Sequence, residues 1–471
     1  MKKVLSTVAA LGLVAGLAST AAAVEFKMSG KYLVEGAYLS DARTFPTGTT
    51  VNSLTGNGNT TSLVGTSVNL NEMPGVENTS DSYWLHTFEI KPTMKVNDKI
   101  SMSSVIRLAD DTFWGSQGDT GTTSNVGTTT SDVYVHQLYM DYASPIGNMR
   151  LGRTPAGTYG TAFMDADKRA DRVMLYPSFL AAGPVSTLFY LEKVKDNFAA
   201  GSFNPATEVG SVENGTDVDS DTYVARLYYK TDNLDSGIHY AYTRDMTNTA
   251  TIDSDVKHTL TAYGKFKMDN IFVNGELTHY MGSREYDSAA NADRDYDSWA
   301  AMAQAGIKLD ALTVSAMGFY AQGQDMNKNT YGDDIQNALG TAGTGDQFEP
   351  LYILTGRHTG MLNNDVFSGN TTLLSTSGVQ AGVVAVDYAV SNQLSLHGAI
   401  GYAKADEIVA ANQDKDYGWE YNVGAAYKLL DNLTYEAHFG YLDTGDYFNF
   451  GDTSDSTNSI YILTHSLTMT F

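Results

Sequence analysis

Acidic and basic side chains lie close together in one short stretch that also contains glycine, residues 154–170 (TPAGTYGTAFMDADKRA). Its charged members are Asp165, Asp167, Lys168 and Arg169. Carboxylates and cations at such close spacing set the electric field felt by any ion or polar molecule that passes them. The glycines of this stretch permit sharp bends of the backbone. The stretch therefore combines a backbone that can bend with charges of both signs, and it contains no recognised catalytic motif.

Signals for catalysis or for a bound metal are weak elsewhere in the chain. The nine histidines are scattered singly, and neither a GxSxG nor an HExxH motif occurs. Without cysteine the chain has no thiolate nucleophile, no Cys-ligated zinc and no CxxCH haem site. Asp217, Asp219 and Asp221 are spaced like calcium ligands, but no glycine or later glutamate completes an EF-hand loop. We therefore expect no enzyme activity, no cofactor and no metal site.

The composition excludes several other classes of protein. The chain has 471 residues, with 54 acidic against 30 basic side chains and a formal net charge of −24. Sequence-independent binding of nucleic acid needs a net basic footprint, so we expect no nucleic-acid partner. Charged residues make up only 18% of the chain, below the roughly 25% typical of soluble domains. An aromatic content of 11% is too high for a disordered coil.

The first 23 residues have the pattern of a secretory signal peptide. Lys2 and Lys3 precede an apolar run from Val4 to Leu17, and small residues follow at 21–23. The run is shorter than the roughly 20 residues of a spanning helix, which argues against a membrane anchor. We therefore predict a signal peptide at 1–23 and a single β-domain at 24–471. Removal of the two lysines changes the formal charge from −24 to −26.

The rest of the chain is dominated by apolar residues at every second position. One such row is Leu433, Tyr435, Ala437, Phe439 and Tyr441. A period of two is the repeat of a β-strand with one apolar and one polar face. Because this pattern recurs in segments of about ten residues, separated by turn residues, the sequence predicts an all-β fold.

Short and long connections alternate between the predicted strands. The short ones, such as 97–99, 269–270 and 431–432, are rich in Asp and Asn, whereas the long ones, such as 40–81 and 323–377, are polar. Lipid offers no hydrogen bonds, so a membrane-spanning sheet must close on itself. We therefore predict a transmembrane antiparallel β-barrel with short periplasmic turns and long extracellular loops.

Counting the alternating segments gives about eighteen strands, with sixteen as the alternative. The weakest predicted strand is 171–178, where Pro177 and neighbouring charges interrupt the pattern. Without this strand, the long segment 195–220 would fall on the tight-turn side of the barrel. The even count places both chain termini at the short-turn rim.

Two stretches carry a resemblance to a known family. The last strand ends in alternating apolar residues and a terminal Phe471, and it resembles the terminal signature of Gram-negative outer-membrane porins, from which His465 departs. The stretch MRLGRTPAG at 149–157 is similar to the Gly-Arg pair that ends the fifth strand of general diffusion porins. The resemblance implies that 154–170 folds into the lumen as a constriction loop, and that Arg153 faces the pore.

The expected pore residues fall into two sets. The predicted constriction contains Arg153, Asp165, Asp167, Lys168 and Arg169. Alternation points a second set inward on the wall: Lys91, Arg107, Arg150, Arg226, Lys265 and Lys308. Arg153 conflicts with this rule, because alternation groups it with Met149 and Leu151 on the lipid side. A bulge at Gly152 would turn Arg153 inward.

The resemblance implies a water-filled channel for passive diffusion of small hydrophilic solutes and ions. Its partners would be outer-membrane lipid and lipopolysaccharide, and it would form a homotrimer as many such porins do. The acidic charge, with Asp165 and Asp167 in the predicted constriction, predicts a weak preference for cations. The alternatives are a channel specific for sugars or carboxylates, and a structural barrel that sheathes a partner such as an electron-conducting cytochrome.

Overall fold

The computed structural model describes residues 24–40, 80–114, 133–155, 157, 159–161, 163–164, 169–195, 219–247, 252–286, 291–328, 333–342, 344–345, 347–359, 361–362, 374, 376–409, 412–449 and 457–471. The predicted signal peptide and three members of the predicted constriction, Asp165, Asp167 and Lys168, lie outside these ranges.

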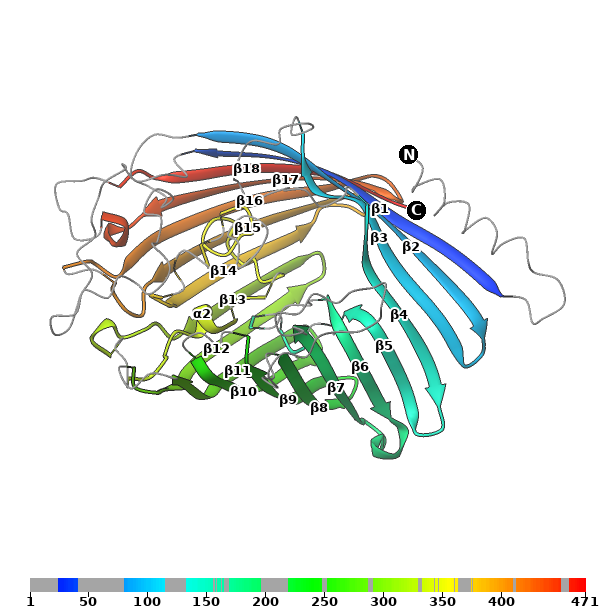
Figure 1. The fold of residues 1–471 in the computed structure, drawn as a ribbon. Coiled ribbons are helices and arrows are strands. Elements are labelled where there is room, and N and C mark those ends of the chain that lie inside the picture. The colour runs from blue at the N-terminus through cyan, green and yellow to red at the C-terminus, as the bar shows by residue number, and fades with distance from the viewer. Residues whose placement is uncertain are drawn as a thin grey trace.

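Eighteen antiparallel strands form one closed barrel within the described residues (Figure 1). The strands are β1 (Glu25–Ser40), β2 (Asp81–Asn97), β3 (Ile100–Phe113), β4 (Tyr134–Ser144), β5 (Gly147–Pro155), β6 (Arg169–Pro177), β7 (Val185–Lys195), β8 (Ser220–Lys230), β9 (Leu234–Asp245), β10 (Ile252–Met268), β11 (Ile271–Tyr286), β12 (Arg294–Leu309), β13 (Leu312–Ala321), β14 (Val379–Ala389), β15 (Leu394–Lys404), β16 (Asp416–Leu430), β17 (Leu433–Thr444) and β18 (Ile460–Thr470). Each pairs with its neighbours in sequence, and β1 also pairs with β18, which closes the sheet. The predicted fold class and the count of eighteen are confirmed.

The strand predicted with least support is present as β6. It pairs with β5 without a register shift, from Gly147 opposite Pro177 to Pro155 opposite Arg169. Pro177 is the last residue of the strand, where a missing N–H interrupts no further ladder bond. A 3₁₀ turn, η2 (Ser178–Leu180), then leads toward β7.

Two-residue turns connect many strands at one end of the barrel. Asp269 between β10 and β11, and Asp310 between β12 and β13, have φ angles of +53° and +49°. Aspartate tolerates this left-handed conformation better than most residues, which explains its place in these hairpins. Longer connections join the strands at the other end, and those that the structure describes include η3 (Met326–Lys328), α2 (Ala338–Ala342) and η4 (Asp446–Asn449).

The two faces of the wall differ as the alternation predicts. On β16 the outward side chains Trp419, Tyr421 and Val423 are 46%, 46% and 58% exposed. The inward Glu420 and Asn422 are buried. An exterior this rich in exposed apolar and aromatic side chains suits contact with hydrocarbon. Among the described residues, no helix has the length and apolar character needed to cross a membrane.

The largest cluster of buried apolar residues lies inside the barrel. It joins wall residues such as Phe319 on β13 to residues from two connections, among them Phe163, Leu351 and Ile353. Figure 1 shows part of the connection between β13 and β14 (yellow) within the outline of the barrel. The barrel interior is therefore partly filled by the chain itself.

Candidate functional site

Two segments of the chain lie against the inner wall and touch each other. The first inner segment comprises the described residues between Gly157 and Met164, and the second comprises those between 344 and 362. The ring of Phe163 packs edge-on against that of Phe348, with centroids 4.9 Å apart. The backbone N–H of Gly345 donates to the carbonyl of Phe163 at 2.9 Å. The two segments thus narrow the same part of the lumen.

Arg226 on β8 fixes the start of the first inner segment. The residue is only 3% exposed, and its guanidinium donates to the carbonyl of Gly157 at 3.2 Å and to the hydroxyl of Tyr190 at 3.3 Å. Its Nε donates to Nδ1 of His239 at 3.0 Å. The guanidinium also lies 5.1 Å from the ring centroid of Tyr159, within the range of a cation–π contact. Arg226 faces inward as predicted, but it positions a segment of the chain.

The second inner segment binds to the barrel wall at β17 and β1. The hydroxyl of Tyr352 lies 2.8 Å from Nδ1 of His438 on β17. Arg357 donates to the carboxylate of Glu35 on β1 at 2.5 Å. Burial lowers the pKa of Arg357, but the adjacent Glu35 carboxylate outweighs burial, so the pKa lies above its usual value. His358 Nε2 approaches the same carboxylate at 2.9 Å, so Glu35 holds two residues of this segment.

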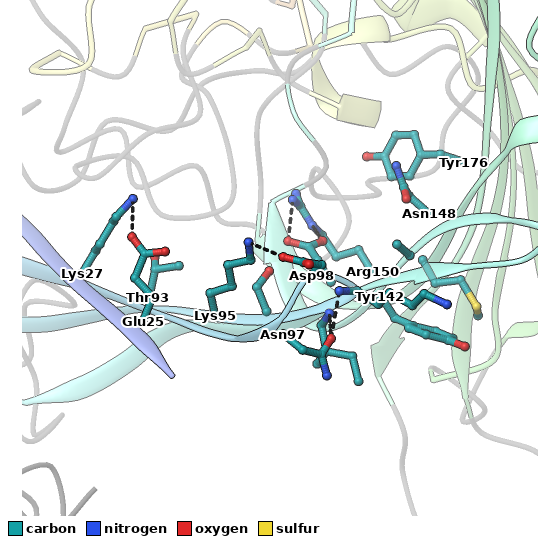
Figure 2. Close-up of a pocket in the computed structure, with 16 residues that line it drawn as sticks. Glu25, Lys27, Thr93, Lys95, Asn97, Asp98, Tyr142, Asn148, Arg150 and Tyr176 are labelled. Atoms are coloured by element: carbon teal, nitrogen blue, oxygen red, sulfur yellow. Dashed lines mark hydrogen bonds and ion pairs between the residues drawn. The ribbon is translucent and has the colours of Figure 1, made fainter. Parts of the chain in front are cut away.

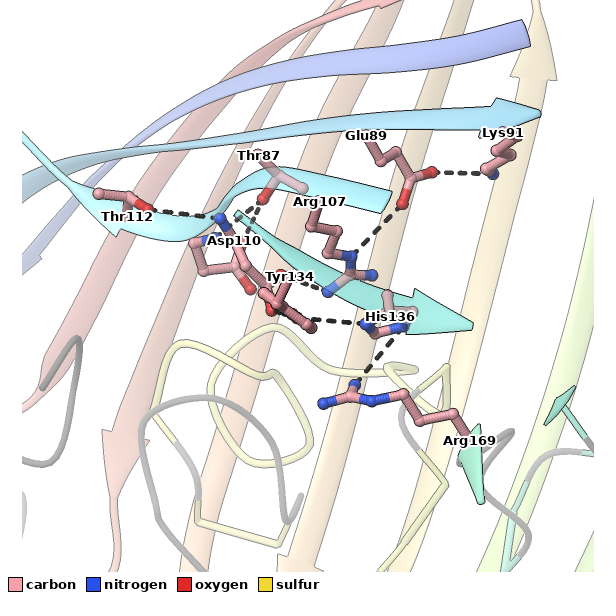
Figure 3. Close-up of polar contacts among 10 residues, drawn as sticks. Thr87, Glu89, Lys91, Arg107, Asp110, Thr112, Tyr134, His136 and Arg169 are labelled. Atoms are coloured by element: carbon pink, nitrogen blue, oxygen red, sulfur yellow. Dashed lines mark hydrogen bonds and ion pairs between the residues drawn. The ribbon is translucent and has the colours of Figure 1, made fainter. Parts of the chain in front are cut away.

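A second cluster of charges lines the wall of β2, β3 and β4 (Figure 3). Glu89 lies between two cations, at 2.8 Å from Nζ of Lys91 and 3.4 Å from Nε of Arg107. Arg169, at the start of β6, reaches His136, with Nη1 and Nε2 3.5 Å apart. Arg107 also pairs with Asp110. Both signs of charge therefore meet on this inner wall.

A hollow of about 590 Å³ opens beside the short turns of β2–β3 and β4–β5 (Figure 2). It is lined by three ion pairs: Lys27 with Glu25 at 2.9 Å, Lys95 with Asp98 at 2.8 Å, and Arg150 with Asp141 at 2.7 Å. The hydrogen bond from Lys95 lowers the pKa of the Asp98 carboxyl in the turn. Arg150 thus belongs to the short-turn mouth of the barrel.

A second cavity of about 460 Å³ lies where the inner segments meet β10 to β15. Its lining includes Lys265, Glu349, Asp387 and His397. The carboxylate of Asp387 lies 2.8 Å from Nδ1 of His397. Lys308 shares the face of Gln304, another lining residue, and lies exposed near the short-turn end of β12.

Arg153 does not lie where the resemblance predicted. β5 keeps its register with β4 and β6 through Gly152, so no bulge turns the side chain inward. Arg153 stays on the face of Met149 and Leu151 and pairs with Asp171 at 3.2 Å, with both side chains about half exposed. The assignment of Arg153 to the constriction is therefore wrong, because strict alternation prevails.

Sequence reasoning missed the second inner segment and the wall carboxylates Glu276 and Glu420. The available signal was a set of inward glycines on three consecutive strands, Gly401, Gly424 and Gly440. A Cβ at Gly401 would lie 2.8 Å from the side chain of Leu351. These glycines make room for a backbone that crosses the inner wall.

The acidic and histidine side chains of the described residues do not group as metal ligands. No group of three or more His, Asp and Glu side chains there could hold a metal ion. Asp219 and Asp221, from the acidic run, instead pair with Lys193 at 3.2 and 2.8 Å.

No family model matches the chain, and no curated protein matches it. Solved structures of similar arrangement include a BenF-like porin from Pseudomonas fluorescens Pf-5 (9% identical, covering 94% of this chain and 99% of that chain, TM-score 0.49). The anion-selective porin from Comamonas acidovorans (10% identical, 95% and 100%, TM-score 0.43) and the outer membrane channel DcaP of Acinetobacter baumannii (11% identical, 95% and 97%, TM-score 0.43) are similar too.

The class of the fold follows from the geometry of this chain. An even-stranded, closed antiparallel barrel with an apolar exterior, tight turns at one end and longer connections at the other is the architecture of bacterial outer-membrane barrels. With eighteen strands and charged residues on the inner wall, it has the fold of the outer-membrane porins, as the resemblance predicted.

Proposed function

We propose that this protein is an outer-membrane porin that lets small hydrophilic solutes and ions diffuse passively through a water-filled lumen. The observation that carries the proposal is the contrast between its apolar exterior and an inner wall that carries paired charges of both signs. Charged side chains inside a barrel keep a path hydrated, whereas on the lipid face they destabilise the fold. The outer surface then contacts membrane lipid and lipopolysaccharide, and a homotrimer stays a prediction of the resemblance.

Two inner segments that narrow the lumen favour a channel with a size limit. They also argue against the alternative of a sheath around a partner protein, because the chain itself occupies part of the interior. A channel specific for sugars or carboxylates is the second candidate, favoured by the same narrowing. Saturation of the solute flux, or block of the ion current by one solute class, distinguishes it from general diffusion.

The proposed selectivity is a weak preference for cations. Glu349 and Asp387 border the 460 Å³ cavity against a single lysine, Lys265. This adds to the prediction from Asp165 and Asp167. The bases of the opposite wall, Arg107 among them, keep the preference weak.

The double variant Glu349→Gln with Asp387→Asn is expected to shift the reversal potential toward anions in a KCl gradient. The permeability ratio of cations to anions should fall roughly twofold, since two carboxylates leave a narrow part of the path. Both replacements keep a side-chain oxygen for the groups that Glu349 and Asp387 now bind, the N–H of Arg357 and the ring of His397.

Lys265→Gln is the matched control and should shift the potential the other way. The same measurement on Asp165→Asn with Asp167→Asn tests the contribution of those two residues. An unchanged reversal potential in all three variants would contradict the proposed cation preference.

A further inference from the structure

A carboxylate on β11 holds the backbone of the first inner segment. Glu276 is 4% exposed, and its Oε2 accepts from the backbone N–H of Thr161 at 2.7 Å and from the Thr161 hydroxyl at 2.8 Å. Its Oε1 accepts from the N–H of Met164 at 3.1 Å. The carboxylate thus replaces its lost hydration with donors that all belong to the first inner segment.

A carboxylate on β16 holds the second inner segment in the same way. Glu420 is fully buried, and its Oε1 and Oε2 accept from the N–H groups of Ile353 and Leu354, each at 2.8 Å. Successive N–H groups that converge on one carboxylate fix both the position and the orientation of the backbone. Such a bond depends on two acceptor oxygens, which glutamine does not supply.

The wall around Glu420 is shaped to receive the segment. A Cβ at Gly424 would lie 2.9 Å from the hydroxyl oxygen of Tyr352, and one at Gly440 would lie 3.3 Å from the Cβ of Tyr352. The absence of a Cβ at these inward positions lets the residues around Tyr352 lie close against the wall. The two glycines and the one carboxylate therefore act on the same few residues.

We infer that Glu276 and Glu420 are positioning residues that hold the two inner segments in the lumen and thereby set the width of the opening. The inference rests on the proposed channel. Because Phe163 and Phe348 pack together, and Gly345 bonds to the carbonyl of Phe163, loss of either carboxylate loosens both segments. The constriction is then one coupled unit held from two sides of the barrel.

Glu420→Gln is expected to raise the single-channel conductance at least about 1.5-fold and to admit larger polyethylene glycols, because the released segment widens the path. Glu276→Gln should also raise the conductance, and it replaces Glu420→Gln as the test if Glu420→Gln fails to fold. Glu436→Gln is the matched control. Glu436 shares the inward face of β17 with His438, and its replacement removes one carboxylate, as Glu420→Gln does. It should change selectivity slightly and leave the size limit unchanged.

A reversible disulfide between the second inner segment and β17 distinguishes the effect of the segment's position from the effect of the lost Glu420 charge. The chain has no cysteine, and the 3.3 Å between Tyr352 Cβ and a Cβ at Gly440 is slightly shorter than the roughly 3.5–4.5 Å Cβ separation of a disulfide, so a small outward shift would allow the bond. In Glu420→Gln carrying Tyr352→Cys and Gly440→Cys, diamide should oxidise the two thiols to a disulfide and return the conductance toward that of the wild type. Dithiothreitol should raise it again. A disulfide that forms without lowering the conductance would overturn the inference.

A readout independent of conduction keeps the inference distinct from the proposed function. Leu351 is fully buried, so Leu351→Cys should react slowly with a water-soluble maleimide and at least about tenfold faster when Glu420→Gln is added. Equal labelling rates, with unchanged conductance in both glutamine variants, would refute the positioning role. A folded wild type that carries no current would contradict the proposed channel, while the labelling would still decide the role of Glu420.

Discussion

Replacement of Ala425 by arginine is expected to destabilise the folded barrel by about 2–4 kcal/mol, the cost of an arginine on the lipid face near the middle of the membrane. Ala425 lies on the outward face of β16 between Val423 and Tyr427, both of which are exposed. The guanidinium would lose water without gaining a partner there. Reversible urea unfolding of the lipid-reconstituted protein, followed by tryptophan fluorescence, measures the change in the free energy of unfolding.

The adjacent residue supplies a control of the same type. Ala426 points inward, opposite Glu436 on β17 and Ser395 on β15. Ala426→Arg therefore places the cation in the lumen, near a carboxylate, and should change the free energy of unfolding little. Because a one-residue slip exchanges the two faces of a strand, equal destabilisation by both variants would contradict the register of β16.

Replacement of residues 347–362 by a short Gly/Ser linker is expected to raise the single-channel conductance roughly twofold or more, because the second inner segment leaves the lumen. The barrel should still close, since its ladders run strand to strand and β1 pairs with β18 without help from this segment. Glu420 and Glu35, now bound to the segment, would be hydrated by the widened lumen.

Circular dichroism checks the architecture of this deletion variant, and conductance in planar bilayers checks the pore. A β spectrum like that of the wild type, together with a larger conductance step, is the expected pair of results. An intact barrel with an unchanged conductance step would mean that the second inner segment does not line the narrowest part of the path.

Local periodicity was enough to predict the barrel, because each strand repeats the same two-faced pattern regardless of its partners. Even the irregular β6 followed, since the alternation of short and long connections required it. The alternation of side chains along β5 predicted an outward Arg153, whereas the family resemblance predicted an inward one. The register through Gly152 is continuous, so the side chain stays outside.

The interior was much less predictable. The second inner segment has no period of its own, and its place depends on contacts between residues far apart in sequence, such as Leu354 with Glu420 or Arg357 with Glu35. Alternation places Glu420 on the inward face of β16, next to the outward Trp419 and Tyr421. It could not indicate that the carboxylate would be fully buried, because burial depends on the loop that covers it.

The measurement that tests the central proposal most directly is the single-channel conductance of the refolded protein in a planar lipid bilayer. A folded barrel with a hydrated lumen should give stable, uniform conductance steps in KCl, with a reversal potential that indicates a weak preference for cations. Protein that shows a β spectrum by circular dichroism and inserts into lipid, yet gives no conductance steps, would contradict the proposed channel.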